Sequence, residues 1–288
     1  MRTLTFTNSK GNSITLSNAP PFVLQKFETS NSVNIYDAKG VSQDGTTYLG
    51  NTLDTRDITL TITVMASTKP EMSGYRSIFS AVFNPKLGEG YLIYKDDTKE
   101  RKVKCLVSKL PFFGLTEDTV DDCLISLTAC NPYWEELQEI KAEIALWIGS
   151  FSFPLEIIES GIEMGYRMPS LIVNVLNEGD SPSGMRIEFK ALATLDTPSI
   201  LNVNDQTQFI RINKTMVAGE VISITTGYGN KRVESTLNGV ATNAFAYIDL
   251  GSTFMQLDVG DNLLRYDAVN GLDNLVVSIY FVPMYLGV

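Results

Sequence analysis

Apolar and polar residues alternate with a period of two along most of the first half of the chain. Between residues 57 and 65, Ile58, Leu60, Ile62 and Val64 alternate with threonines. Because successive side chains of a β-strand point to opposite faces, this pattern predicts a strand with one buried and one wet face. The β-branched residues also suit a pleated surface. The same alternation predicts two further strands, at residues 103–107 and 123–129.

One segment of the first half has helical periodicity instead. It opens at Pro70, which suits the first turn of a helix because the N–H that proline lacks has no partner there. It ends at Asn84-Pro85, since the residue before a proline is disfavoured in the helical region. Between these limits the apolar residues are spaced by three and four positions: Met72, Tyr75, Ile78, Phe79, Val82 and Phe83. The pattern predicts one amphipathic helix of about four turns.

The pattern changes after Trp134. Residues 135–147 are charged, with apolar positions spaced for a short amphipathic helix or a linker arm, and residues 151–158 resemble a strand. From Leu171 onward β-type alternation returns. Turn signals then recur about every ten residues, at Gly179, Gly219, Gly227, Gly239, Gly260 and Gly271. Many short strands at this spacing are typical of an antiparallel β-sandwich.

These patterns predict a mainly β protein with two domains, a number that 288 residues readily accommodate. We expect residues 1–135 to form a β domain that carries one α-helix. We expect residues 136–150 to form a linker arm and residues 151–288 to form the antiparallel β-sandwich.

Acidic residues are concentrated in the second half of the chain. The net charge of −10 divides into −1 for residues 1–135 and −9 for residues 136–288. An acidic surface repels phosphate backbones, so we expect no tightly bound nucleic acid. The strongest candidate for a membrane span, residues 275–286, is shorter than the ~20 residues that a spanning helix needs. We therefore expect no membrane insertion, and the alternating N-terminus predicts no signal peptide.

The three cysteines, Cys105, Cys123 and Cys130, all lie in the first half. An odd number without a CxxC pair fits neither a disulfide framework nor a zinc site. Cys105 and Cys123 also occupy inward-facing positions of predicted strands. We expect all three to be buried free thiols in a reducing cytosol.

The sequence contains no histidine, which removes the commonest general base and the commonest metal ligand. Adjacent carboxylates occur at three places, but neighbours on a strand point to opposite faces and cannot flank one glycosidic bond. We interpret them as solvated turn and edge charges. They are Asp96-Asp97, Asp121-Asp122 and Glu135-Glu136. A glycosidase-like enzyme, built from carboxylates distant in sequence, stays an open alternative.

Two glycine-containing segments invite a ligand-binding interpretation. Residues 258–262 (DVGDN) lack the ligand spacing and the distal glutamate of an EF-hand loop, so a turn between strands is preferred. Residues 227–231 (GYGNK) lack the GK[ST] ending and the following helix of a phosphate-binding loop, which favours a hairpin turn. Most aromatic residues fall on predicted core positions, and Tyr228 at a turn tip is the exception. The sequence therefore predicts no catalytic, cofactor-binding or metal-binding residue, and no cofactor.

The second half contains, in order, the segments NEGDSPSGMRIEF, TPSILN, AGEVISITTGYGNKRV, LDVGDNLLRYDA and VVSIYFVPMYLGV. These segments resemble the C-terminal domain of the distal tail proteins of long-tailed (siphovirus-type) bacteriophages. The first half resembles the same family in its strands, its Pro-opened helix and its closing CNPYW. The likeness covers essentially the whole chain. It rests on turn and strand patterns that occur in the same order, and not on a catalytic signature.

The resemblance implies a structural protein of the phage tail hub or baseplate, and not an enzyme. In that family the N-terminal domains close into a hexameric ring that continues the tail tube. The C-terminal domain is a galectin-like or carbohydrate-module-like sandwich that projects outward and can carry receptor-binding proteins. The implied partners are further copies of the chain, the tail tube protein, and tail-associated or receptor-binding proteins. The implied location is the tail tip of the virion, after synthesis in the cytoplasm of the host bacterium.

A second interpretation is a carbohydrate-binding module for host cell-wall sugars. Saturable binding of such sugars through an aromatic platform would distinguish it from a tail hub protein. Family members that carry an additional sugar-binding module have it as a long insertion. This chain contains no such insertion, which weakens the case for direct adhesion to the host.

Overall fold

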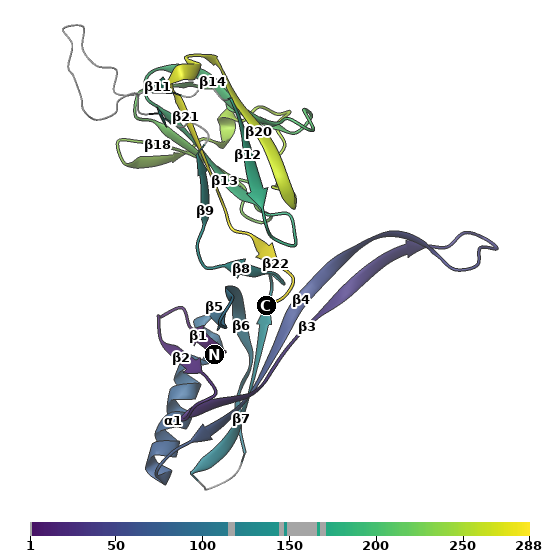
Figure 1. The fold of residues 1–288 in the computed structure, drawn as a ribbon, viewed down its shortest axis with the longest axis vertical. Coiled ribbons are helices and arrows are strands. Elements are labelled where there is room, and N and C mark those ends of the chain that lie inside the picture. The colour runs from purple at the N-terminus through teal and green to yellow at the C-terminus, as the bar shows by residue number, and fades with distance from the viewer. Residues whose placement is uncertain (1, 115–118, 144–146, 149–165, 168–170) are drawn as a thin grey trace. The chain divides into compact units, whose positions relative to one another are not determined.

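The computed structural model describes most of the chain (Figure 1), namely residues 2–114, 119–143, 147–148, 166–167 and 171–288. The chain divides into two compact units, each with its own hydrophobic core. Unit 1 comprises residues 1–137 together with residues 285–288, and unit 2 comprises residues 138–284. Within the described residues, no helix is long and apolar enough to cross a membrane.

Unit 1 is built on one sheet in which neighbouring strands are antiparallel, with the order β2-β1-β5-β6-β7-β4-β3. A short strand, β8, pairs with β6 and also with β22. The strand predictions of the first half are confirmed within β4, β6 and β7. The strands are β1 (Thr3–Thr7), β2 (Ser13–Leu16), β3 (Phe22–Ala38), β4 (Thr47–Met65), β5 (Gly90–Lys95), β6 (Glu100–Phe113), β7 (Val120–Ala129), β8 (Trp134–Glu136) and β22 (Met284–Tyr285).

The core of unit 1 consists of the inward-facing side chains of these strands and one face of a helix. Leu60 of β4 lies opposite Ile125 of β7, and both side chains are fully buried. Phe6 of β1 stacks on Phe83 with 4.7 Å between ring centroids. Burial of a side chain of this size contributes about 1.5–3 kcal/mol. The apolar residues of the period-two alternation therefore form the core of the unit.

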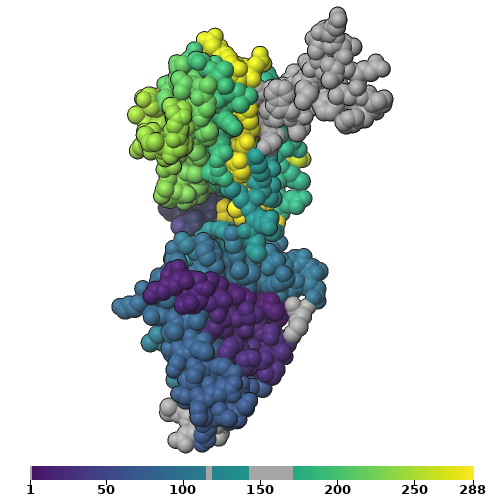
Figure 2. Space-filling view, turned by 90° about the vertical axis from the view of Figure 1, so that its left-hand side faces the viewer, coloured from purple at the N-terminus to yellow at the C-terminus, as the bar shows by residue number. Residues whose placement is uncertain are grey.

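The predicted helix is confirmed as α1 (Lys69–Val82). The Thr68 hydroxyl accepts a hydrogen bond from the Glu71 N–H at 3.3 Å, and the Glu71 carboxylate accepts one from the Ser67 N–H at 2.7 Å. This reciprocal arrangement satisfies two amides at the helix start that would otherwise lack partners. Figure 2 shows the blue residues of α1 beside the purple N-terminal strands of unit 1. The buried side chains of the helix are Met72, Phe79 and Val82.

Unit 2 is an antiparallel β-sandwich, as the sequence predicts. One sheet has the order β19-β18-β17-β13-β21-β9, and the other has the order β12-β20-β14-β15 with β16 also paired to β14. Buried aliphatic and aromatic side chains from both sheets form its core. The strands are β9 (Ile140–Glu143), β12 (Ile172–Asn177), β13 (Met185–Ala191), β14 (Leu195–Asn202), β15 (Phe209–Arg211), β16 (Thr215–Met216), β17 (Val221–Thr225), β18 (Arg232–Leu237), β19 (Val240–Asn243), β20 (Gly260–Asn270) and β21 (Leu275–Phe281).

The structure differs from the expected linker arm at residues 136–150. The segment Ile140–Glu143 forms strand β9 at the edge of a unit 2 sheet, where it pairs with β21. A further short strand, β10 (Trp147–Ile148), pairs with β11 (Tyr166–Arg167). A segment this short has too few apolar positions for their spacing to distinguish a helix from a strand. Pairing with the open edge of β21 gives hydrogen-bond partners to backbone groups that water would solvate in a linker arm. The strand predicted at residues 151–158 lies outside the described residues.

Arg56 ties together three segments of unit 1 that are distant in sequence. Its side chain is 4% exposed, and its guanidinium donates three hydrogen bonds. The acceptors are the Pro132 carbonyl at 2.6 Å, the Thr29 hydroxyl at 2.7 Å and the Leu286 carbonyl at 2.7 Å. Burial lowers the pKa of the Arg56 guanidinium, and these acceptors compensate for the water that the charged group has lost.

We therefore expect the substitution Arg56→Met to destabilise unit 1 by on the order of 3–5 kcal/mol. Each hydrogen bond to a charged group is worth about 1.5–3 kcal/mol, and the three are not additive. The measurement is urea unfolding followed by the fluorescence of Trp134, which is fully buried in unit 1, in a Trp147→Phe background. The exposed Arg232→Met in unit 2 is the matched control. Equal midpoints for the two variants would contradict the role assigned to Arg56.

Candidate functional site

The carboxylate pairs predicted from the sequence have structural partners. Asp96 accepts hydrogen bonds from the Thr98 and Lys99 N–H groups, both at 2.7 Å, and from the Thr98 hydroxyl at 2.9 Å. These donors stabilise the ionised form and lower the pKa of Asp96 to about 2. An acid of this kind holds a turn in place and is a poor proton donor near neutral pH.

The prediction that these pairs are solvated is wrong for Asp121, which is 4% exposed. Its carboxylate lies 2.6 Å from the Arg76 guanidinium, because α1 places Arg76 against the start of β7. Asp122 points to the other face and accepts a hydrogen bond from the Thr63 hydroxyl at 2.7 Å. Glu135 is half-buried, and burial raises its pKa. Among the described residues, no three His, Cys, Asp or Glu side chains lie close enough to share a metal ion.

Both glycine-containing segments are turns in the structure. The Asn262 amide is buried and donates to the carbonyls of Val175, Asp258 and Gly260 at 3.2, 2.8 and 3.0 Å. Its amide oxygen, the atom that could bind a cation, accepts from the Asp258 N–H at 2.9 Å, so the side chain closes its own turn. Residues 227–231 connect β17 to β18 as a hairpin turn, as predicted. Tyr228 is 86% exposed at this turn, where the sequence places it.

The three cysteines are free, but only two are buried. Cys105 and Cys123 face the core of unit 1, and burial raises the pKa of each thiol to about 12. The prediction of burial is wrong for Cys130, which is exposed. It follows Ala129, the last residue of β7, so it lies just beyond the strand and outside the alternation that buries Cys123.

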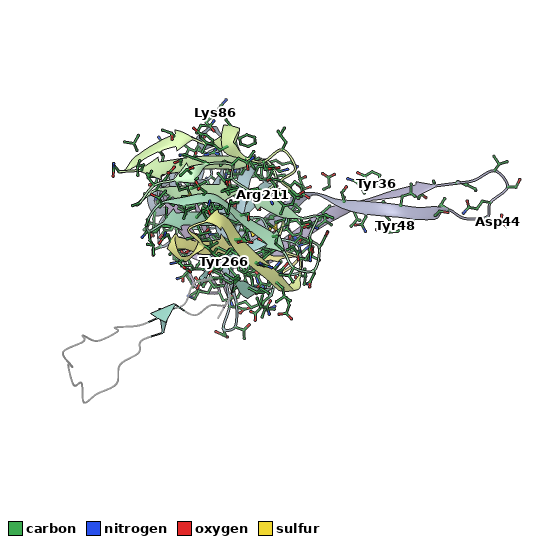
Figure 3. All side chains as sticks on the ribbon, turned by 90° about the horizontal axis from the view of Figure 1, so that it is seen from above. Tyr36, Asp44, Tyr48, Lys86, Arg211 and Tyr266 are labelled. Atoms are coloured by element: carbon green, nitrogen blue, oxygen red, sulfur yellow. The ribbon has the colours of Figure 1, made fainter. Side chains whose placement is uncertain are left out.

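The hairpin formed by β3 and β4 is the most prominent feature of unit 1 (Figure 1). β4 pairs with β7 only from Arg56 to Met65, so the preceding part of β4 pairs with β3 alone. We call residues 31–55 the arm. Figure 3 shows Tyr36 and Tyr48 along the arm and Asp44 near its tip.

The arm exposes large apolar side chains. Their exposed fractions run from 50% to full exposure, in Val33, Ile35, Tyr36, Val41, Tyr48 and Leu49. An isolated two-stranded hairpin is marginally stable in water, and clustered exposed apolar residues mark interaction surfaces. The sequence prediction missed this surface. The alternation of Val33 with Ile35 and the glycines at positions 40 and 45 were the available signal for a hairpin.

A second apolar surface lies on the outer face of the same sheet. Phe112 of β6 lies opposite Leu124 of β7, and Met65 of β4 lies opposite Val120 of β7. These four side chains and Leu110 are between 36% and 68% exposed. We call these five residues the outer patch. The outer patch and the arm are two different apolar surfaces on one unit.

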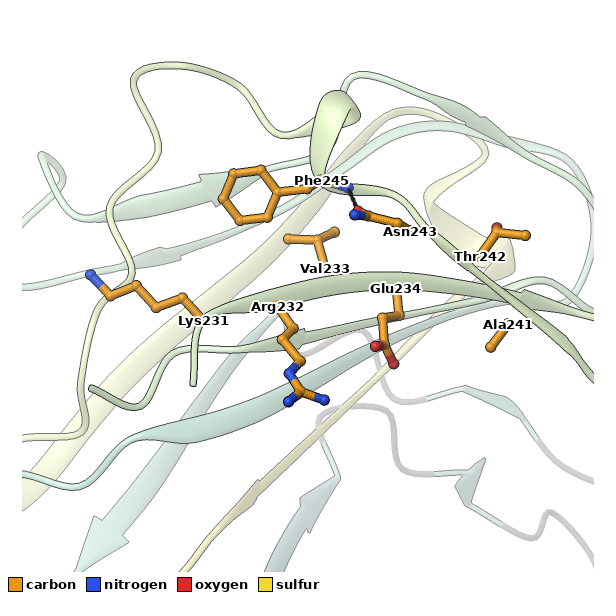
Figure 4. Close-up of a pocket in the computed structure, with 8 residues that line it drawn as sticks. All are labelled: Lys231, Arg232, Val233, Glu234, Ala241, Thr242, Asn243 and Phe245. Atoms are coloured by element: carbon orange, nitrogen blue, oxygen red, sulfur yellow. Dashed lines mark hydrogen bonds between the residues drawn. The ribbon is translucent and has the colours of Figure 1, made fainter. Parts of the chain in front are cut away.

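In unit 2, one hollow of about 340 Å³ lies beside Phe245 (Figure 4). Phe245 stacks on Phe254 with 6.0 Å between ring centroids. The Arg232 and Glu234 side chains extend from the other side of β18, away from the ring of Phe245 (Figure 4). Both charged residues nevertheless line the same hollow as Phe245, which they approach from a different direction.

A second hollow of unit 2, of about 360 Å³, lies on the outer face of the sheet β12-β20-β14-β15. Ser199 of β14 is the direct cross-strand neighbour of Arg211 of β15 on one side and of Asp267 of β20 on the other. Directly opposed residues share a face of the sheet, so these three side chains project together. Thr197 and Asn213 also line the hollow. We call these five residues the polar face.

Comparison with known proteins identifies the family. The model of the phage tail protein RIFT-related domain matches residues 9–118, and that of the siphovirus-type tail component, C-terminal domain, matches residues 178–285. Together the two matches span about three quarters of the chain. The chain belongs to the siphovirus-type distal tail proteins.

Solved structures show the fold of this distal tail protein in relatives of low sequence identity. The crystal structure of the SPP1 Dit (gp 19.1) protein, described as a paradigm of the hub adsorption apparatus in phages that infect Gram-positive bacteria, matches with a TM-score of 0.72. The identity is 11%, and 99% of this chain and 100% of that chain are covered. A chain of the phage P2 baseplate in its activated conformation with Ca matches with a TM-score of 0.55 at 11% identity and full coverage of both chains. No curated protein matches by sequence.

This distal tail protein is therefore a structural component of a bacteriophage tail, and its place is the tail of the virion. The predicted fold class, mainly β with one helix in the N-terminal part and an antiparallel C-terminal sandwich, is confirmed. The arm, the outer patch and the polar face are the surfaces that we consider for its function.

The thiols give a test of the unit 1 core. At pH 8, Cys130 should react quickly with a thiol reagent because it is exposed, whereas Cys105 and Cys123 should react only after unfolding. Their raised pKa leaves almost no thiolate, which is the reactive form. The measurement is a timed thiol titration of the folded and the denatured protein.

In that titration, Cys130→Ser is the control and should remove the fast reaction alone. Fast reaction of two or three thiols in the folded protein would contradict the structure.

Proposed function

We propose that this distal tail protein forms a homo-hexameric hub ring at the distal end of the tail tube and carries the receptor-binding components of the phage. The observation that carries the proposal is the arm, whose apolar side chains are exposed in the single chain. In the ring, the arm of one copy lies against unit 1 of the next copy. The similarity to the SPP1 Dit protein, a paradigm of the hub adsorption apparatus, supports this assignment.

A closed ring requires two different surfaces on each copy, because its contacts run head to tail. Unit 1 offers the arm and the outer patch, which lie on different parts of the sheet. Residues 1–135 carry a net charge of only −1, so copies approach one another without strong repulsion. Burial of a large apolar side chain is worth about 1.5–3 kcal/mol, so a few such side chains per contact stabilise a ring against the cost of association.

The proposed partners are further copies of the chain, the tail tube protein and tail-associated or receptor-binding proteins, after synthesis in the host cytoplasm. The protein is not an enzyme in this proposal. The chain contains no histidine, and two of the candidate carboxylates, Asp96 and Asp121, are engaged in a turn and an ion pair. Both residues have structural partners in place of a substrate.

The double substitution Ile35→Asp, Tyr48→Asp should prevent ring formation. It places two carboxylates on the exposed apolar surface of the arm. Burying these unpaired charges in the contact between copies would cost several kcal/mol per contact. Light scattering across a concentration series, with and without the tail tube protein, should show the mass of the unsubstituted protein rising toward six copies.

Val240→Asp in unit 2 is the matched control, because Val240 is also a strand residue and is 64% exposed. It should leave assembly unchanged. A strict monomer at every concentration, alone and with the tail tube protein, would refute the ring. Full assembly of the Ile35→Asp, Tyr48→Asp variant would refute the role of the arm.

The acidic second half predicts the chemistry of the proteins that the ring carries. Residues 136–288 have a net charge of −9, so a partner that docks on unit 2 should present Lys or Arg. Its association rate should fall by on the order of tenfold or more between about 50 and about 500 mM salt, since salt screens long-range attraction. Stopped-flow or surface plasmon measurements with the phage's receptor-binding proteins provide the rate. A rate that does not change with salt would rule out electrostatic docking on unit 2.

A further inference from the structure

The polar face of unit 2 brings together groups that the hub role does not require. Arg211, Ser199 and Asp267 stand in one row across β15, β14 and β20. Adjacent strands lie about 4.8 Å apart, so the three side chains span about 10 Å of one sheet face. The hollow above them, of about 360 Å³, falls within the range of small-molecule sites.

The backbone beside this row is strained. Thr197 has a φ of +51°, which is a left-handed conformation that a β-branched residue rarely adopts. Its N–H donates to the Lys214 carbonyl at 3.1 Å, and the Pro198 carbonyl accepts from the Ile212 N–H at 3.0 Å. Such strain is concentrated at functional sites. Thr197 itself lines the hollow, so the strain lies at the proposed ligand position.

The donors of the polar face are held in place by Asp249. The Asn213 amide donates to the Asp249 carboxylate at 3.2 Å, and the Arg211 guanidinium lies 4.0 Å from it. The Gly251 N–H also donates to Asp249, at 2.8 Å, and these groups lower the pKa of the carboxyl. Asp249 therefore stays ionised and orients the two donors.

The charges around the hollow are balanced. Arg265 lies 3.7 Å from Asp267 at its edge, so two guanidinium groups face two carboxylates, those of Asp249 and Asp267. The Arg211 side chain is 47% exposed and a guanidinium carries five donors, which leaves donors for a ligand. Balanced charge favours neither a phosphate nor a cation. It suits an uncharged ligand whose groups both donate and accept hydrogen bonds.

We propose that the polar face binds a neutral saccharide. Neighbouring sugar hydroxyls donate to Asp267 and accept from Arg211 and Asn213, and the hydroxyls of Thr197 and Ser199 do both. Val269, which is 69% exposed and lines the same hollow, contacts the apolar C–H face of the sugar ring. This goes beyond the hub function, because a ring assembles without any saccharide.

The test is saturation-transfer NMR on the full-length protein with a defined panel of probes. The panel holds the methyl glycosides of glucose, galactose, rhamnose, N-acetylglucosamine and N-acetylgalactosamine, with poly(glycerol phosphate) as an anionic comparator. At least one glycoside should show saturable transfer that changes less than twofold between about 50 and about 500 mM salt. Arg211→Met and Asp267→Asn should each weaken this binding by at least tenfold.

Arg232→Met and Glu234→Gln form the matched control, because they alter an arginine and a carboxylate at exposed positions of the other sheet. They should leave the affinity unchanged. The proposal is overturned by the absence of transfer to every glycoside, by transfer that depends only on Arg232 and Glu234, or by binding of poly(glycerol phosphate) alone. None of these outcomes changes the mass measured by light scattering. The two experiments therefore test the saccharide proposal and the ring proposal independently.

Discussion

The buried guanidinium of Arg56 determines where the parts of unit 1 meet. It joins β3 at Thr29, just before the arm, to the segment after β7 at Pro132 and to the C-terminal segment at Leu286. A charged group inside a protein costs several kcal/mol unless all its donors have partners, so none of the three segments can move away without leaving that cost uncompensated. β4 also stops pairing with β7 at Arg56, and therefore the arm begins next to this hydrogen-bonded guanidinium.

The arm explains why unit 1 is built for assembly. Its two strands extend beyond the sheet with apolar side chains such as Ile35 and Tyr48 exposed, and a two-stranded hairpin of this kind gains little stability by itself. In the proposed ring, a second copy would remove this apolar area from water without any change in the core. The firm attachment at Arg56 matters here, because an arm with a fixed origin loses less conformational freedom when it docks than a free segment would.

The sequence predicted those parts of the fold that follow from local periodicity. The alternation of Ile58, Leu60, Ile62 and Val64 became the buried face of β4, and the spacing after Pro70 became α1. It did not predict β9, because four residues at a sheet edge take their conformation from the partner β21. The arm was missed for the same physical reason as the burial of Asp121: both depend on which segments come together in space. The polar face could not be predicted from the sequence. Arg211 and Asp267 share a face only because both strands pair with β14 in a register that places each opposite Ser199.

Net charge is divided unequally between the two halves of the chain, and this division affects what each can bind. Unit 1 combines exposed apolar side chains with a near-neutral charge, which is the combination that the proposed contact between copies requires. The acidic second halves of neighbouring copies repel one another, but salt limits this repulsion to about 8–10 Å. In the proposed ring, the negative charge therefore affects a partner docked on unit 2 more than it affects the distant second halves of other copies. Within this acidic region the paired charges of Arg211 with Asp249 and Arg265 with Asp267 create a locally neutral area. In the proposed saccharide site, an uncharged, hydroxyl-rich ligand forms hydrogen bonds with these oriented donors and acceptors. Its binding depends little on the net negative charge of the domain.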